Sequence, residues 1–362
     1  MCSDDIPLFL FWRKENGMAK VKPNYLFGSI ILLMMSLPTV PSFGAIDPEK
    51  IMGAAACSDC HTSEYAGWQA STHFKVYKTL HRSPEARDIA RKLSIKGNLR
   101  RSDRCMTCHY TPKGAKRTAV SGTSCESCHG GAKDWLDLHS TPAAGSGYTL
   151  ETEPVGDRTA RLVKAEEAGM IRPHQVYRVA ENCIQCHTVP DEDLVNIGGH
   201  TAGSAFELVA WLQGEVRHNF FISNGEKNHE APTELIPAQH LRVLYVIGRM
   251  LDLEYSLRAA ARTTQPGIYA DAMKKRVEDA RTSLEEIQQR AKNPELSAII
   301  KEMLVASPQV SLESGNGPAS ERAAESVKKA AQRFGARYDG SKLTGLDPLL
   351  PKAYKGSVYK GN

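Results

Sequence analysis

The stretch Gly122-Thr123-Ser124-Cys125-Glu126-Ser127-Cys128-His129-Gly130 contains two cysteines three positions apart, with a histidine directly after the second. The same five-residue pattern recurs at Cys57–His61, Cys105–His109 and Cys183–His187. Eight of the nine cysteines in the 362-residue chain fall in these four copies, and only Cys2 lies outside them. A repeated cysteine–histidine motif therefore dominates the chemistry of the chain.

Each copy of the motif predicts one covalently attached haem c. Two thiols at this spacing can add across the two vinyl groups of one haem, and the adjacent histidine then lies beneath the iron as its proximal ligand. The residues so assigned are the thioether cysteines Cys57, Cys60, Cys105, Cys108, Cys125, Cys128, Cys183 and Cys186 and the proximal iron ligands His61, His109, His129 and His187. A zinc site or a redox dithiol is the alternative, but neither requires a histidine after every second cysteine. The sequence therefore predicts four haems.

Histidines outside the motifs are candidates for the sixth iron ligand. The chain has 12 histidines, so eight remain after the four proximal ones. Imidazole at this position keeps the reduction potential low, whereas methionine raises it. His73 follows His61 on an expected helix at a distance of about 18 Å, which favours delivery to a neighbouring haem. His139, ten residues after His129, is expected to act in the same way.

The first and third motifs resemble the cytochrome c-554 family. The likeness rests on Cys60-His61 followed by Trp68 and His73, and on residues 122–130 followed by His139 and a fourth motif. It covers roughly Cys57 to His218, under half of the chain. The resemblance implies a tetrahaem electron carrier, because the type member of that family accepts electrons from hydroxylamine oxidoreductase in ammonia-oxidising bacteria.

The family resemblance also implies a set of distal ligands. His139 would bind the haem on His61, His73 would serve the third or fourth haem, and His218 would complete the set of three bis-histidine haems. The haem on His109 would then be five-coordinate. His200, between Gly199 and Thr201, departs from the family pattern, and if it binds this iron the open site is lost. Both alternatives stay open in the sequence.

Four segments follow one another along the chain. We expect residues 1–44 to be an upstream extension plus an export signal peptide that is removed, because Lys20 and Lys22 precede an apolar run from Tyr25 to Val40. That run is shorter than the roughly 20 residues that span a bilayer. Residues 45–230 would form the tetrahaem domain, 231–337 a helical extension and 338–362 an irregular tail. The mature protein is therefore expected in the periplasm, soluble and not spanning the membrane.

The helical extension shows an apolar seam between Tyr269 and Ala291. The seam residues, spaced four and three apart, are Met273, Val277, Ala280, Leu284, Ile287 and Ala291. This pattern predicts a helix with one narrow apolar face. Intramolecular packing in a helical hairpin or bundle is the favoured interpretation, and a dimer or partner-docking surface is the alternative. The expected fold class is mainly α, a multihaem cytochrome c built around four covalent haems with a C-terminal helical extension.

Composition and motifs together predict a periplasmic tetrahaem cytochrome that relays single electrons between a donor and an acceptor redox protein. The formal net charge of +5 does not indicate a nucleic-acid partner, because each ferric haem adds roughly −1 and four bring the protein close to neutral. No catalytic residue is assigned, and the oligomeric state is open. The first alternative is an enzyme that acts on a nitrogen oxide or hydroxylamine-type substrate at an open haem on His109. The second is a structural subunit of a respiratory complex.

Overall fold

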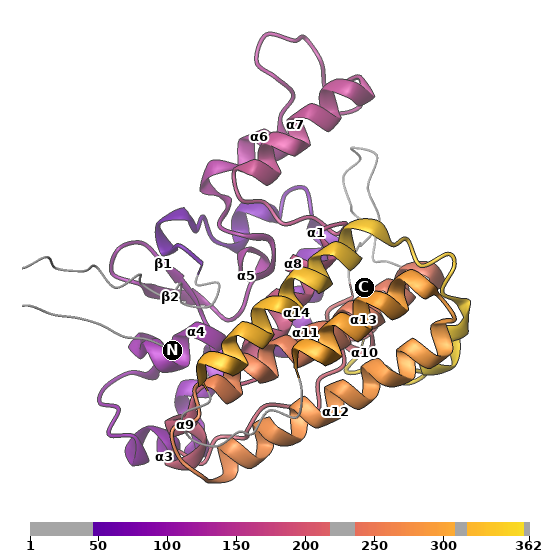
Figure 1. Ribbon diagram of the computed structural model, residues 1–362. Helices are drawn as coiled ribbons and strands as arrows, with labels where there is room; N and C mark the ends of the chain where they lie inside the picture. The colour runs from indigo at the N-terminus through magenta and orange to yellow at the C-terminus, as the bar shows by residue number, and fades with distance from the viewer. Residues whose placement is uncertain (1–45, 218–235, 308–316, 358–362) are drawn as a thin grey trace, which may run out of the picture. The chain divides into compact units, whose positions relative to one another are not determined.

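The structure is a computed structural model that describes residues 46–217, 236–307 and 317–357. It is mainly helical, as the sequence predicts (Figure 1). The described residues contain one small sheet of two strands. The expected signal peptide and His218 lie outside the described residues. In the ranges that are described, we find no helix with the length and apolar character that a bilayer crossing requires.

Short helices make up the part of the chain that carries the four motifs. In chain order they are η1 (Pro48–Lys50), η2 (Ala54–Cys57), α1 (Thr62–Ala70), α2 (Thr72–Thr79), η3 (Leu80–Arg82), α3 (Pro84–Lys92), η4 (Leu99–Arg101), α4 (Asp103–His109), α5 (Cys125–His129), η5 (Ala132–Asp134), α6 (Leu136–Ser140), α7 (Val155–Glu167), α8 (Val176–His187), α9 (Glu192–Asn196) and α10 (Leu208–Leu212). The second, third and fourth motifs each end a helix, so that His109, His129 and His187 are the last residues of α4, α5 and α8. The first motif instead joins η2 to α1.

A small hairpin connects the second motif to the third. Its strands are β1 (Thr111–Lys113) and β2 (Thr118–Ser121), which pair antiparallel with Thr111 opposite Ser121. The buried Thr111 hydroxyl lies 3.0 Å from the Ser124 hydroxyl, at the N-terminal cap of α5. The hairpin therefore fixes the start of the third motif relative to the end of the second.

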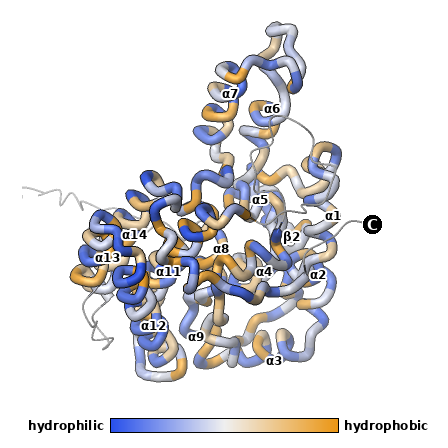
Figure 2. Tube along the Cα trace, turned by 90° about the vertical axis from the view of Figure 1, so that its right-hand side faces the viewer, coloured by the Kyte–Doolittle hydropathy of each residue, from blue (hydrophilic) through white to orange (hydrophobic). Residues whose placement is uncertain are grey.

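Four long helices form a bundle after the motif segment. They are α11 (Ala238–Ala261), α12 (Ile268–Ala291), α13 (Pro294–Ala306) and α14 (Gly317–Arg337), followed by η6 (Thr344–Leu349). Helix α11 packs against α8, α12 and α14, and α13 packs between α12 and α14. In Figure 2, orange and blue residues alternate along α12 and α14, as expected of helices with one buried face.

The seam on α12 is buried within the chain. All six of its residues, from Met273 to Ala291, are buried. Five of them lie in the main hydrophobic cluster with residues of α11, α13 and α14, and Met273 lies in a smaller cluster. Helix α13 begins at Pro294, where the side chain of the capping residue Asn293 accepts a hydrogen bond from the Leu296 N–H at 2.9 Å. The expectation of an intramolecular helical extension is confirmed.

The hydrophobic core is distributed unevenly between the two parts. The main cluster joins the bundle to α8 through Val176, Tyr177, Ala180 and Ile184, so that the helix carrying the fourth motif is anchored in the bundle. The clusters among the first three motifs are small, such as the one formed by Ala132, Trp135, Ala165 and Met170. Leu343 and Leu346, in the segment expected to be irregular, are fully buried against the bundle.

Candidate haem sites

Three motif histidines each face a histidine from a distant part of the chain. The ring pairs are His61 with His139 (centroids 6.0 Å apart, planes at 12°), His73 with His187 (6.4 Å, 64°) and His109 with His200 (6.4 Å, 52°). The remaining motif histidine is His129, in the third motif. Its expected partner, His218, lies outside the described residues. The structure thus brings together six of the eight histidines that the sequence singles out.

The ring separations fit one metal ion between each pair. An imidazole centroid lies about 3 Å from an ion bound through a ring nitrogen, given a metal–nitrogen bond of about 2 Å, so two imidazoles on opposite sides of one ion have centroids about 6 Å apart. All three observed separations are close to this value. The residues therefore fit a haem iron held by two histidines.

Hydrogen bonds at Nδ1 fix the orientation of several of these rings. The bonds are His129 Nδ1–H to the Ile171 carbonyl oxygen (2.9 Å), His200 Nδ1–H to the Thr201 carbonyl oxygen (2.8 Å) and His187 Nδ1 to the Ser204 hydroxyl (3.1 Å). When Nδ1 carries the proton, Nε2 keeps the lone pair that binds a metal, and such bonds are typical of metal-ligating histidines. These three side chains are therefore arranged for ligation through Nε2.

Burial keeps several of these histidines in the neutral form that binds metal. Burial, together with neighbouring positive groups, lowers the pKa of His109, His139 and His187 to about 4. Burial also lowers the pKa of His73 and His129. These rings are neutral at pH 7, and a metal-bound imidazole must be neutral.

The motif cysteines are free thiols that approach one another across motifs. All eight are unpaired by disulfides. The Cys57 thiol lies beside Cys125, which lowers the pKa of Cys57, and Cys108 lies beside Cys186 and has its pKa lowered in the same way. The first motif therefore adjoins the third, and the second adjoins the fourth.

A buried carboxylate inside the third motif ties the first motif to it. Glu126 is 1% exposed, and its two oxygens accept the backbone N–H groups of Met52 (2.7 Å), Gly53 (2.7 Å) and Ala132 (2.9 Å). The indole N–H of Trp68 adds a second tie by donating to the Thr123 carbonyl oxygen at 2.8 Å. Nothing in the sequence marks Glu126, because it occupies a variable position of the motif and no spacing singles it out.

Close backbone contact positions the segment that carries His73. Gly122 packs against the His73 carbonyl oxygen, and a Cβ at residue 122 would lie only 1.9 Å from it. Only glycine allows this approach. The chain just before the third motif therefore lies against the backbone of the histidine that faces the fourth.

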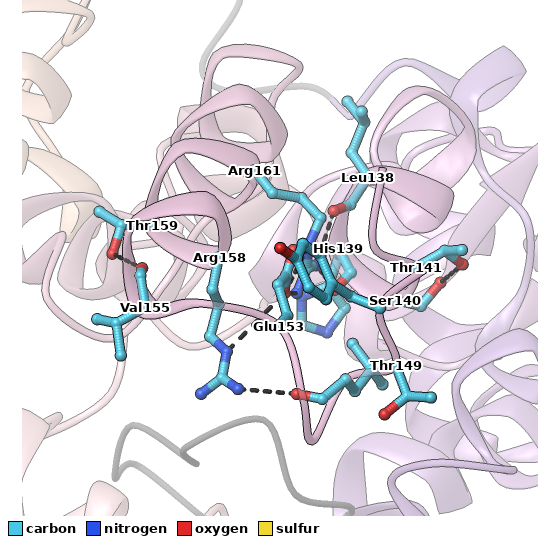
Figure 3. Close-up of polar contacts among 12 residues, drawn as sticks. Leu138, His139, Ser140, Thr141, Thr149, Glu153, Val155, Arg158, Thr159 and Arg161 are labelled. Carbon is cyan, nitrogen blue, oxygen red and sulfur yellow. Dashed lines mark hydrogen bonds and ion pairs between the residues drawn. The ribbon is translucent and has the colours of Figure 1, made fainter. Parts of the chain in front are cut away.

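His139 lies at the end of a five-residue helix and is held through its backbone. Figure 3 shows Arg161 and Glu153 beside it. Arg161 is 8% exposed, and its guanidinium donates to the Leu138 carbonyl oxygen at 2.9 Å and to the His139 carbonyl oxygen. The same guanidinium binds both oxygens of Glu153, which is 5% exposed. Neither residue is marked by any motif in the sequence.

Two other histidines that could have been ligands lie elsewhere. His174 has a half-exposed side chain, and its Nε2 lies 3.3 Å from a Glu166 carboxylate oxygen. His81 lines a surface cavity with Arg87 and Arg91. Neither ring faces a motif histidine among the ring contacts of the described residues.

Part of the chain is similar in sequence to known cytochromes. Residues 56–130, which include the first three motifs, match the family model "Cytochrome c554 and c-prime". Cytochrome c-554 of Nitrosomonas europaea is 25% identical over 171 residues, a match that spans 44% of this chain and 66% of that relative. No solved structure matches the chain. The segment that carries the first three motifs is therefore similar to the cytochrome c-554 family.

Proposed function

We propose that the protein is an exported tetrahaem c-type cytochrome that relays single electrons between a donor and an acceptor redox protein. The observation that carries this proposal is the facing of three motif histidines by a second histidine at 6.0–6.4 Å. A haem bound at each motif supplies an iron that takes up and releases one electron. Similarity to the cytochrome c-554 family supports haem c as the cofactor.

The facing pairs suggest which residues hold each iron. His61 and His139 would hold the first, His109 and His200 the second, and His187 and His73 the fourth. For the third, His129 presents Nε2 through its bond to Ile171, and His218 is the proposed partner. Distal ligands that come from other segments lock the motifs together and keep the surroundings of each iron nearly unchanged during electron transfer.

Contacts between motifs support a relay. The cysteine contacts place the first motif beside the third and the second beside the fourth. The Asn182 side chain, next to the fourth motif, donates to the Cys128 carbonyl oxygen of the third. The motifs would therefore form a continuous path in the order first, third, fourth, second.

The position of His200 argues against the alternative of a small-molecule redox enzyme. A substrate could reach the iron on His109 only if its second face were open, and the His200 ring lies opposite His109 at 6.4 Å. In this respect the proposal departs from the family resemblance, which implies an open second haem. Export to the periplasm rests on the signal-like sequence and on covalent haem attachment.

Mass spectrometry and electron paramagnetic resonance (EPR) together test the proposal. The intact exported protein should carry the mass of four haems, and its oxidised EPR spectrum should contain only low-spin signals. Fewer than four haems would contradict the motif assignment. A stoichiometric high-spin signal would show one open iron and favour the enzyme.

A further inference from the structure

The segment 136–167 forms an arm in which α6 and α7 pack against each other, drawn at the top of Figure 1. The arm carries His139 near the end of α6. A helix of five residues is too short to be stable by itself, and the carbonyl groups of its last turn have no partners within the helix. Something outside α6 must therefore fix its end.

Arg161 supplies the missing donors. Its Nη1 donates to two carbonyl oxygens at the end of α6, those of Leu138 and His139 itself (Figure 3). Its Nε and Nη2 bind the Glu153 carboxylate at 2.6–3.1 Å. Because the guanidinium is planar and bound on both sides, it can hold the backbone of residue 139 in one place.

The His139 ring differs from the other candidate ligands in how it is oriented. Its Nδ1 is buried and has no hydrogen-bond partner among the described residues, whereas His129, His187 and His200 each have one. Among the described residues, the His139 ring contacts two other rings. It faces His61, and it lies edge-on to Trp135 with centroids 5.9 Å apart. The support that a second-shell hydrogen bond usually gives to a ligating histidine must come here through the backbone.

We propose that Arg161, held by Glu153, is a positioning residue that keeps His139 opposite His61. This inference rests on the proposed function, because it takes His139 as the sixth ligand of the haem on His61. A purely structural role for the ion pair would stabilise the arm without affecting the ligation of that iron. The two roles are separated by the spin state of one haem.

The test compares five variants of the full-length exported holoprotein by EPR. His139→Ala defines the signal of an open iron on His61. Arg161→Gln removes the planar guanidinium and its charge, and Arg161→Lys keeps the charge without the planar group. Glu153→Gln weakens the ion pair that holds the guanidinium in place. Arg172→Gln is the matched control, because Arg172 is a positive charge close enough to lower the pKa of His139, yet it is bound to Glu166 at 2.8 Å.

We expect Arg161→Gln to show the high-spin signal of His139→Ala in part, Arg161→Lys and Glu153→Gln to show less of it, and Arg172→Gln to show none. Haem content by mass and helicity by circular dichroism establish that each variant is folded. If Arg161→Gln does not accumulate, Glu153→Gln carries the test.

Wild-type low-spin spectra in both Arg161→Gln and Glu153→Gln, beside a high-spin His139→Ala, would overturn the positioning role alone. An equal high-spin signal in Arg172→Gln would also overturn it, because charge and not position would then control ligation. A low-spin His139→Ala would instead refute the ligand assignment on which the inference rests.

Discussion

His200 is the residue that would decide the chemistry of the haem proposed at His109. It follows Gly199, whose positive φ of 81° turns the chain, and its Nδ1–H is bound to the Thr201 carbonyl oxygen. The ring is thereby directed with Nε2 free, 6.4 Å from His109 between centroids. This fixed placement supports the proposal that His200 is a ligand.

Replacing His200 by alanine should open the iron on His109. We expect one of the four haems to change from low-spin to high-spin and to bind an added ligand such as cyanide or carbon monoxide, measured by EPR and visible absorption. His174→Ala is the control, since its half-exposed ring lies beside Glu166. An unchanged spectrum in His200→Ala would show that the iron on His109 has no ligand from this residue.

Glu126 is a second residue whose effect can be measured directly. In Glu126→Gln, one of the two acceptor oxygens becomes an NH₂ group that faces backbone donors from Met52, Gly53 or Ala132. The loss should lower the free energy of unfolding by about 1–3 kcal/mol, because at least one buried N–H is left without a partner. Denaturant titration of the holoprotein measures it. Glu49 is exposed and lies close to Met52 in the chain, so Glu49→Gln should change the free energy of unfolding little. An equal effect in both variants would refute the role of Glu126 as a buried acceptor.

At the scale of elements, α8 connects the motif-carrying part of the chain to the bundle. This part, residues 46–217, is called the haem segment below. One end of α8 carries the fourth motif, and its apolar face packs into the main core against α11. A polar contact crosses the same interface, where the Tyr177 hydroxyl donates to the buried Glu254 carboxylate at 2.7 Å. Arg258 also binds Glu254, at 3.0 Å, and contacts Glu321 and Glu325 on α14. This network links α8, α11 and α14.

The α8–α11 interface should make stability depend on pH. Burial raises the pKa of Glu254 to about 7, against 4.5 for an ordinary glutamate. Between these values the folded protein binds more protons than the unfolded chain, so stability from this group is present at low pH and is lost as the pH rises toward 7. The slope should approach about 1.4 kcal/mol per pH unit. Unfolding at fixed oxidation state in wild type and Glu254→Gln measures it, and an identical slope in both would contradict the assignment.

Helix α12 is also the element that the sequence predicts best. Its apolar period can be read locally, and every seam residue from Met273 to Ala291 is buried. The short helices around the motifs are less regular, because their positions depend on cofactors and on distant contacts. Local pattern therefore specifies the bundle better than the haem segment.

At the scale of the whole molecule, the haem segment and the bundle should respond differently to loss of haem. The bundle has an extensive core, whereas the first three motifs contain only small apolar clusters. Without the cofactors, the segment before Val176 lacks the apolar interior that would offset its conformational entropy. Haem is therefore expected to be required for one part of the fold and not for the other.

Limited proteolysis of haem-free protein tests this expectation. Protein made without residues 1–44, the proposed export signal, should lack attached haem. It should be cut between residues 46 and 175 while a fragment containing α8 and the bundle survives. The holoprotein, digested in parallel, should resist cleavage in that region. Uniform resistance of the haem-free chain would show that the haem segment folds on its own.

The sequence identifies the cysteine–histidine motifs by their spacing, but it does not show which distant residues lie beside them. Spacing alone identifies Cys57–His61 and its three copies, because thioether attachment is a local geometric requirement. The approach of His200 to His109, or of Arg161 to the end of α6, depends on contacts between segments far apart in the chain. Such contacts leave no periodic trace, which is why Arg161 and Glu153 could not be found before the structure.

The three facing histidine pairs differ in the angle between their ring planes, 12° for one and 52° and 64° for the others. In a low-spin ferric centre, parallel and crossed axial planes split the iron d orbitals differently and so give different magnetic anisotropy. The centre on His61 should then be distinguishable from those on His109 and His187 without any isotope label. A redox titration followed by its magnetic signature would show where in the relay the first electron resides.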